Sequence, residues 1–122
     1  IRYDVGERSN FILLPMLEAG LTQVLDWGPE AIQDYCRQLC AEAVRELRRL
    51  GCLVEDDDRR AAHLFGVRLP TGFDLDTIQM ALSKHGVSIS MRGNAIRVSP
   101  HVYNDARDLA ALVAATRAVI GP

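Results

Sequence analysis

The sequence predicts an α+β domain: a small, largely antiparallel sheet of three or four strands with helices packed on it, preceded by two N-terminal helices. Three observations lead to this fold class. Apolar residues recur every three or four positions over residues 15–50. They alternate with polar residues over 63–69 and 87–91, a further strand is expected at 95–99, and helical spacing returns at 75–82 and 104–119.

Two helices are expected first. Pro15–Trp27 carries its apolar residues at helical spacing. Gly28-Pro29 ends this helix and opens a second, which should run from Pro29 to about Leu50 before Gly51 stops it. On the polar face of the second helix, acidic residues precede basic ones by three positions, an arrangement that is mildly stabilising.

Short strands follow the two helices. Cys52–Glu55 and His63–Leu69 read as strands, and the charged segment 55–60 between them is interpreted as a solvated loop. Asp74 should cap a short helix that Gly86 ends.

The last third of the chain predicts a hairpin and a helix. Val87–Met91 and Ala95–Ser99 are joined by so short a loop that they should pair antiparallel. Asn104 is expected to cap the final helix, whose first turn carries acidic residues that suit the helix dipole.

Composition narrows the classes of function. A chain of 122 residues is long enough for one domain with its own core, and 48% apolar and 25% charged residues are typical of a soluble fold. The net charge of −2 gives no electrostatic reason to expect nucleic acid, and the longest apolar run, Phe11–Leu14, is too short to cross a membrane. We therefore expect neither nucleic acid nor a membrane as a partner, and a cytoplasmic location.

The residues also give little reason to expect a metal. Cys36 and Cys40 lie four positions apart on one helical face, but no further Cys or His stands at ligand spacing. Free cysteine is commonly a small buried residue, and we interpret all three cysteines, Cys52 included, in that way. The acidic run Asp56–Asp58 lacks the spacing and the glycine of a calcium loop.

One arginine stands in the middle of a predicted strand. Arg97 is surrounded in sequence by Ala95, Ile96 and Val98, which are residues typical of a packed strand. Two interpretations stay open. Arg97 is either exposed on the polar face, or partly buried and in need of an anion, for which a carboxylate is the best bidentate partner.

The stretch around Arg97 resembles a known family. Residues 97–104, Arg-Val-Ser-Pro-His-Val-Tyr-Asn, resemble the C-terminal signature of the class-V aminotransferases, which include cysteine desulfurases, selenocysteine lyases, kynureninases and isopenicillin-N-epimerase-like proteins. Residues 86–93, Gly-Val-Ser-Ile-Ser-Met-Arg-Gly, are similar to the strand of this family that ends in Arg-Gly. Residues 3–10, Tyr-Asp-Val-Gly-Glu-Arg-Ser-Asn, are similar to the segment that leads from the large domain into the small one. The similarity spans nearly the whole chain in the right order.

The resemblance implies site residues. Arg97 matches the arginine that binds the α-carboxylate of an amino-acid substrate, and Arg92 matches a second arginine at the mouth of the active site that can contact substrate. Ser9 or Asn10 would donate to the phosphate of pyridoxal 5'-phosphate, in place of the family's commoner threonine.

The remaining matched positions have structural explanations. His101 and Tyr103 would flank the site, where packing accounts for both, and capping accounts for Asn104.

The chain lacks the catalytic groups of such enzymes. The cofactor is bound through a lysine and pairs with an aspartate, and in the family both lie in the large domain. Lys84 is the only lysine here, and a cation at a helix end suits the dipole. Only Gly93–Ile96 separates Arg92 from Arg97, which leaves no room for the desulfurase loop that carries a catalytic cysteine. An aminotransferase, epimerase-like or kynureninase-like parent is therefore favoured, and no catalytic residue is expected in this chain.

We therefore expect residues 1–122 to be the C-terminal small domain of a fold-type I pyridoxal-phosphate-dependent aminotransferase or lyase. Because the chain begins at Ile1 rather than Met, it should be a piece of a longer protein, with residues 1–12 as the connection from an absent large domain. The parent should bind pyridoxal 5'-phosphate and an amino acid and form a homodimer, whereas the isolated piece should be inactive and free of cofactor.

Two rival hypotheses stay open. The chain is alternatively a free-standing α+β module, binding an amino acid through Arg97 for regulation, or a plain interaction domain with Arg92 and Arg97 exposed to solvent.

Overall fold

The computed structural model describes residues 11–121. The chain divides into two compact units, Ile1–Ala31 and Ile32–Pro122. In the first unit, α1 (Leu13–Trp27) begins two residues before the predicted start and ends at Gly28, whose N–H donates to the carbonyls of Val24 and Leu25. None of its residues is buried, and apolar side chains are exposed along its length.

Helix α2 (Pro29–Arg49) confirms the second predicted helix to within one residue. Its buried residues, which recur at helical spacing, are Ile32, Cys36, Cys40, Ala43, Val44 and Leu47. The expected ion pairs form on its exposed face, and they join Asp34 to Arg37, Glu42 to Arg45 and Glu46 to Arg49.

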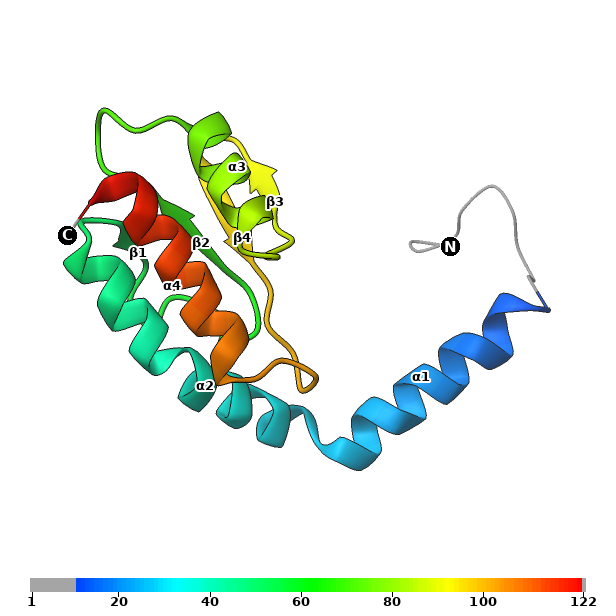
Figure 1. Cartoon of the computed structure of the whole chain (residues 1–122). Helices are drawn as coiled ribbons and strands as arrows, with labels where there is room; N and C mark the ends of the chain where they lie inside the picture. The colour runs from blue at the N-terminus through cyan, green and yellow to red at the C-terminus, as the bar shows by residue number, and fades with distance from the viewer. Residues whose placement is uncertain (1–10, 122) are drawn as a thin grey trace. The chain divides into compact units, whose positions relative to one another are not determined.

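The second unit is built on a four-stranded antiparallel sheet with the strand order β1-β2-β4-β3. The strands are β1 (Leu53–Val54), β2 (Phe65–Arg68), β3 (Ser90–Arg92) and β4 (Ala95–Val98). The predicted hairpin is therefore confirmed, and β4 lies between β2 and β3 (Figure 1).

The predicted strand Val87–Met91 is wrong in its bounds, because β3 begins only at Ser90. The observed register pairs Ser90 with Arg97, and its continuation would bring Val87 opposite Pro100. Proline has no N–H to donate to a ladder, so the pairing ends before it. The alternation at 87–91 indicated burial correctly, since Val87, Ile89 and Met91 all pack against the core while being half-buried.

The two faces of the sheet differ. One face packs against α2, α3 and α4, and its buried residues are Val54, Phe65, Val67, Ile96 and Val98. Figure 1 shows these three helices on the same side of the strands. The other face, here called the open face, carries the alternating residues Leu53, Gly66, Arg68, Ser90, Arg92, Ala95 and Arg97, which are exposed or half-buried. The open face is where a ligand or another domain can reach the sheet.

Side-chain caps fix the starts of α3 (Leu75–Lys84) and α4 (Ala106–Ile120). Asp74 accepts a hydrogen bond from the Thr77 N–H, as predicted. The predicted cap of α4 is wrong: Asp105, not Asn104, is the N-cap, and it forms a capping box with Asp108. Asn104 lies one residue earlier and uses its side-chain oxygen to accept from the His101 N–H, 3.0 Å away.

The Asp105 cap predicts a pH dependence of stability. Hydrogen bonds from Arg107, together with backbone N–H donors, lower the pKa of the Asp105 carboxyl from 3.8. Because the pKa is lower in the folded chain than in the unfolded one, this carboxylate stabilises the fold above about pH 4, and the stabilisation is lost as the pH falls through the folded value. We expect Asp105→Asn to lower the urea midpoint at about pH 6 and to have a much smaller effect at about pH 2.5.

Asparagine is itself a good N-cap, so this substitution tests the charge rather than the hydrogen bond. Asp58→Asn, at an exposed loop carboxylate with no side-chain partner among the described residues, is the control and should show no such trend. Equal losses at both pH values would contradict the prediction.

Candidate functional site

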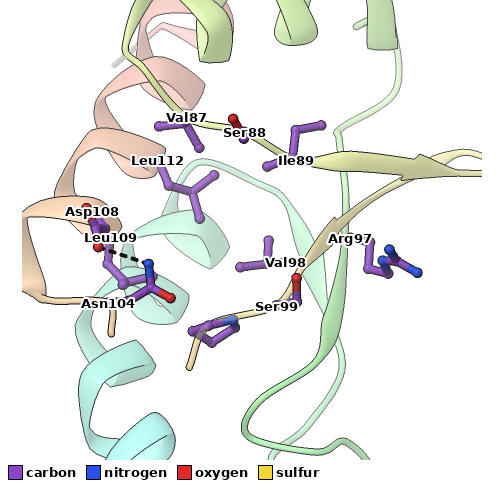
Figure 2. A pocket seen from close by; sticks show the side chains of 11 residues that line it. Val87, Ser88, Ile89, Arg97, Val98, Ser99, Asn104, Asp108, Leu109 and Leu112 are labelled. Atoms are coloured by element: carbon purple, nitrogen blue, oxygen red, sulfur yellow. Dashed lines mark hydrogen bonds between the residues drawn. The ribbon is translucent and has the colours of Figure 1, made fainter. Parts of the chain in front are cut away.

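The open face places Arg97 at its centre. Arg97 lies in β4 and points away from the helices, whereas its neighbour Val98 points toward Leu109 and Leu112 of α4 (Figure 2). The Arg97 side chain is half-buried, and its Nε is shielded from solvent without a hydrogen-bond partner among the described residues. Of the two interpretations of the sequence, the structure therefore agrees better with a partly buried arginine than with a fully exposed one.

Small residues surround Arg97 on the open face. Gly66 of β2 and Ser90 of β3 stand directly opposite it on the two neighbouring strands, and Ala95 lies two positions before it on β4. Gly66 has no side chain, and a Cβ built there would meet only the Ala95 Cβ, at 3.8 Å. The guanidinium therefore has open space beside it, which a bulky residue at these positions would fill.

Arg97 lines a pocket of about 390 Å³, here called the arginine pocket. Arg92 lines the same pocket, so the structure brings together the two arginines that the sequence singled out. Arg92 is exposed at the end of β3, and its guanidinium donates to the Met91 carbonyl at 3.3 Å.

The arginine pocket contains two arginines that the sequence did not indicate, Arg59 and Arg60. Interpreting their charged segment as a solvated loop is wrong for Arg60, whose side chain is only 5% exposed. The guanidinium of Arg60 pairs with Asp57 at 2.7 Å and lies 4.7 Å from the centre of the Phe65 ring. The charged sequence around Arg60 could not indicate that its side chain is buried, because Phe65, the ring that it packs against, lies in the following strand β2.

A second, smaller pocket of about 100 Å³ lies beside the N-terminal end of α4 and is drawn in Figure 2. Its polar lining residues are Ser88, Arg97, Ser99, Asn104 and Asp108, so Arg97 borders this pocket as well as the arginine pocket. Two of them bond to each other: the Asn104 amide donates to Asp108 at 2.9 Å, within the network that caps α4. The neighbouring rings of His101 and Tyr103 stack with their centroids 5.6 Å apart. Asn104 and Asp108 thus belong to the local structure at the start of α4, although Asn104 is not the cap that the sequence predicted.

The remaining candidates lie away from Arg97 or outside the described residues. Lys84 is exposed at the end of α3, and α3 covers the face from which Arg97 points away. The positions expected to meet a cofactor phosphate, Ser9 and Asn10, lie outside the described residues.

The three cysteines are free and buried, in agreement with their interpretation as core residues. Burial raises the pKa of the Cys36 thiol, and it raises the pKa values of Cys40 and Cys52 to about 11. Such thiols carry little thiolate near neutral pH and are poor nucleophiles or metal ligands. Over residues 11–121, three or more Cys, His, Asp or Glu side chains nowhere gather as a metal site would require. No described helix has the length and apolar content needed to span a bilayer.

Comparison with known proteins gives one relative of low identity. No family model matches the sequence. An uncharacterized protein of Schizosaccharomyces pombe, C11D3.10, is 27% identical over 122 residues, which are 96% of this chain and 26% of that protein. The chain thus spans about a quarter of the length of the curated relative that it matches.

Solved structures share the fold. A NifS-like protein matches with a TM-score of 0.62 and 18% identity, over 75% of this chain and 28% of that chain. The ureidoglycine–glyoxylate aminotransferase of Bacillus subtilis matches with a TM-score of 0.64 and 23% identity, over 85% and 29%. The alanine–glyoxylate aminotransferase of a Nostoc species gives 0.64 and 17%, over 85% and 30%. The predicted α+β class is confirmed, and the fold is consistent with the small domain of fold-type I enzymes.

Proposed function

We propose that this chain is the substrate-binding small domain of a larger pyridoxal-phosphate-dependent aminotransferase or lyase, and that Arg97 binds the α-carboxylate of an amino-acid substrate. The observation that carries the proposal is the state of Arg97 on the open face. Its Nε is buried without a partner within residues 11–121, and the residues directly opposite it are small. A carboxylate that accepts two parallel N–H bonds would satisfy this group and fix the substrate in one orientation.

The described residues do not themselves fit the cofactor. Pyridoxal phosphate needs a lysine next to an acidic partner in an enclosed site, and the chain's only lysine, Lys84, is exposed on α3. We therefore assign the cofactor to the part of the parent protein that lies outside this chain. The length of the yeast relative supports such a parent, because this chain matches only 26% of it.

The apolar residues of α1 support docking on the rest of the parent. Leu17 and Leu21 are more than half exposed, at 58% and 54%, and Leu25, at 69%, continues the same helical spacing. A row of exposed leucines is costly in water, so we propose that the large domain covers it. We also propose that the parent is a homodimer.

The test uses the full-length protein with its natural upstream sequence. We expect Arg97→Gln to weaken amino-acid binding about 10- to 100-fold, because a hydrogen bond to a charged group contributes about 1.5–3 kcal/mol. The measurement is a titration of the cofactor absorbance with amino acid, and the cofactor content should stay unchanged. Arg68→Gln removes an arginine from the same face but outside the arginine pocket, so its effect should stay below about twofold.

Unaltered affinity in the Arg97→Gln protein would remove Arg97 from this role. A full-length protein that binds no pyridoxal phosphate would overturn the proposal as a whole. In that case, amino-acid binding by the 122-residue chain alone would favour the regulatory module instead.

A further inference from the structure

The arginines of residues 11–121 that have no carboxylate partner gather on the open face and at the arginine pocket beside it. Most arginines among the described residues form an ion pair with Asp or Glu, and these are Arg37, Arg45, Arg48, Arg49, Arg60, Arg107 and Arg117. The others are Arg59, Arg68, Arg92 and Arg97, and three of these four line the arginine pocket. Unpaired guanidinium groups repel one another, so their collection in one pocket indicates an anionic ligand.

The charge around the arginine pocket exceeds what one carboxylate can balance. Four arginines line it together with one carboxylate, Glu55, and Asp57 outside the pocket neutralises Arg60. Glu55 and Asp57 thus leave two positive charges without a counter-charge. The α-carboxylate bound by Arg97 would balance one of them, and the other remains on the pair formed by Arg59 and Arg92.

The pocket lining and the strand register together place this second charge within reach of a ligand bound at Arg97, whereas Arg68, at the corresponding diagonal position on β2, does not line the pocket. Arg97 stands opposite Ser90, and Arg92 lies two residues further along β3 on the same face. This diagonal position separates the two residues by about 7–8 Å, and their Cβ atoms by somewhat less, a gap that two arginine side chains can bridge through a short ligand. Arg59 approaches from the loop between β1 and β2 and lines the same pocket.

We propose that the substrate carries a second anionic group, and that Arg92 and Arg59 bind this group while Arg97 binds the α-carboxylate. The inference rests on the proposed function and adds the class of substrate: an amino acid with an acidic side chain. Arg92 and Arg59 then determine specificity, because they discriminate a charged side chain from a neutral one of the same shape.

The experiment measures binding to the full-length protein by calorimetry, with pairs of amino acids that differ only in side-chain charge. The probes are glutamate with glutamine, aspartate with asparagine, and O-phosphoserine with serine. We expect at least one acidic member to bind about tenfold or more tightly than its neutral partner. A carboxylate preference and a phosphate preference both support the proposal, and the pair that shows the preference identifies the anion.

Four variants locate the contact. Arg92→Gln and Arg59→Gln should each lower the affinity for the acidic probe about three- to tenfold and change the affinity for the neutral probe less than about twofold. Glu55→Gln removes the pocket's own carboxylate and should raise the affinity for the acidic probe. Arg68→Gln, which removes an unpaired charge of the same open face outside the pocket, should change both probes little.

The outcomes separate the two proposals. The inference is overturned if no acidic probe binds better than its neutral partner, if none binds at all, or if Arg68→Gln matches Arg92→Gln. The role of Arg97 is tested separately, because Arg97→Gln must weaken acidic and neutral probes alike. If it does so while the acidic preference is missing, the proposed function stands and only the substrate class is wrong.

Discussion

Replacing Ile96 by alanine should remove a large part of the stability of the fold. Ile96 is fully buried in the central strand β4, between Val67 of β2 and Met91 of β3, and it belongs to the core that α2, α3 and α4 cover. Truncation of such a side chain costs about 2–5 kcal/mol, from the lost burial and from the cavity left behind. A small domain has only about 5–15 kcal/mol in total.

The measurement is urea or thermal unfolding of the chain, followed by circular dichroism. For a unit of this size, we expect the melting temperature to fall by about 10–30 °C. Leu53→Ala is the matched control, since Leu53 is an apolar residue of the same sheet that is 57% exposed, and it should change the stability by less than about 0.5 kcal/mol. Equal losses in the two variants would show that the sheet does not bury the face that we describe as its core.

Placing a carboxylate next to Arg97 should abolish substrate binding in the proposed parent enzyme. In Gly66→Glu the new side chain stands directly opposite Arg97 on the open face, and no described side chain occupies that space. The carboxylate would pair with the guanidinium, fill the room beside it and repel an anionic substrate. We expect a loss of about 100-fold or more in amino-acid affinity, larger than that of Arg97→Gln, because an added repulsion joins the lost attraction.

Two controls separate charge from volume and from folding. Gly66→Gln has the same shape without the charge and should weaken binding less than Gly66→Glu. Gly66→Ala should fold normally, because its Cβ would meet only the Ala95 Cβ at an ordinary 3.8 Å. If the glutamate variant keeps the affinity of the natural protein, the substrate does not bind beside Gly66, and the open face loses its proposed role.

The regular elements followed from the sequence because their signals are local. Helix periodicity located α2 and α3, and Asp74 marked the beginning of α3 correctly. Predictions were wrong where the end of an element depends on a contact with another segment of the chain. The pairing of β3 ends early because Pro100 lies across the hairpin, and the cap of α4 moved from Asn104 to Asp105 because Asn104 bonds back to His101.

The candidate site was predictable only in part. Arg97 stood out because an arginine in the middle of an apolar strand is unusual, and the family resemblance indicated Arg92; the structure brings both to one pocket. Arg59 was not singled out, because its approach to the pocket depends on how a loop folds back toward the strands. Gly66 carried no signal either, since its importance comes from its register with Arg97. Contacts between residues of different strands cannot be predicted from one local stretch of sequence.

The outer strands of the sheet are very short, and this limits how two copies of the chain can associate. In the order β1-β2-β4-β3, the sheet ends on strands of two and three residues. These short edges offer too few free N–H and C=O groups to pair stably with a strand of a second copy of the chain. Arg92 would also place a charge beside a strand added next to β3. The chain should therefore resist amyloid-like stacking through the edges of this sheet.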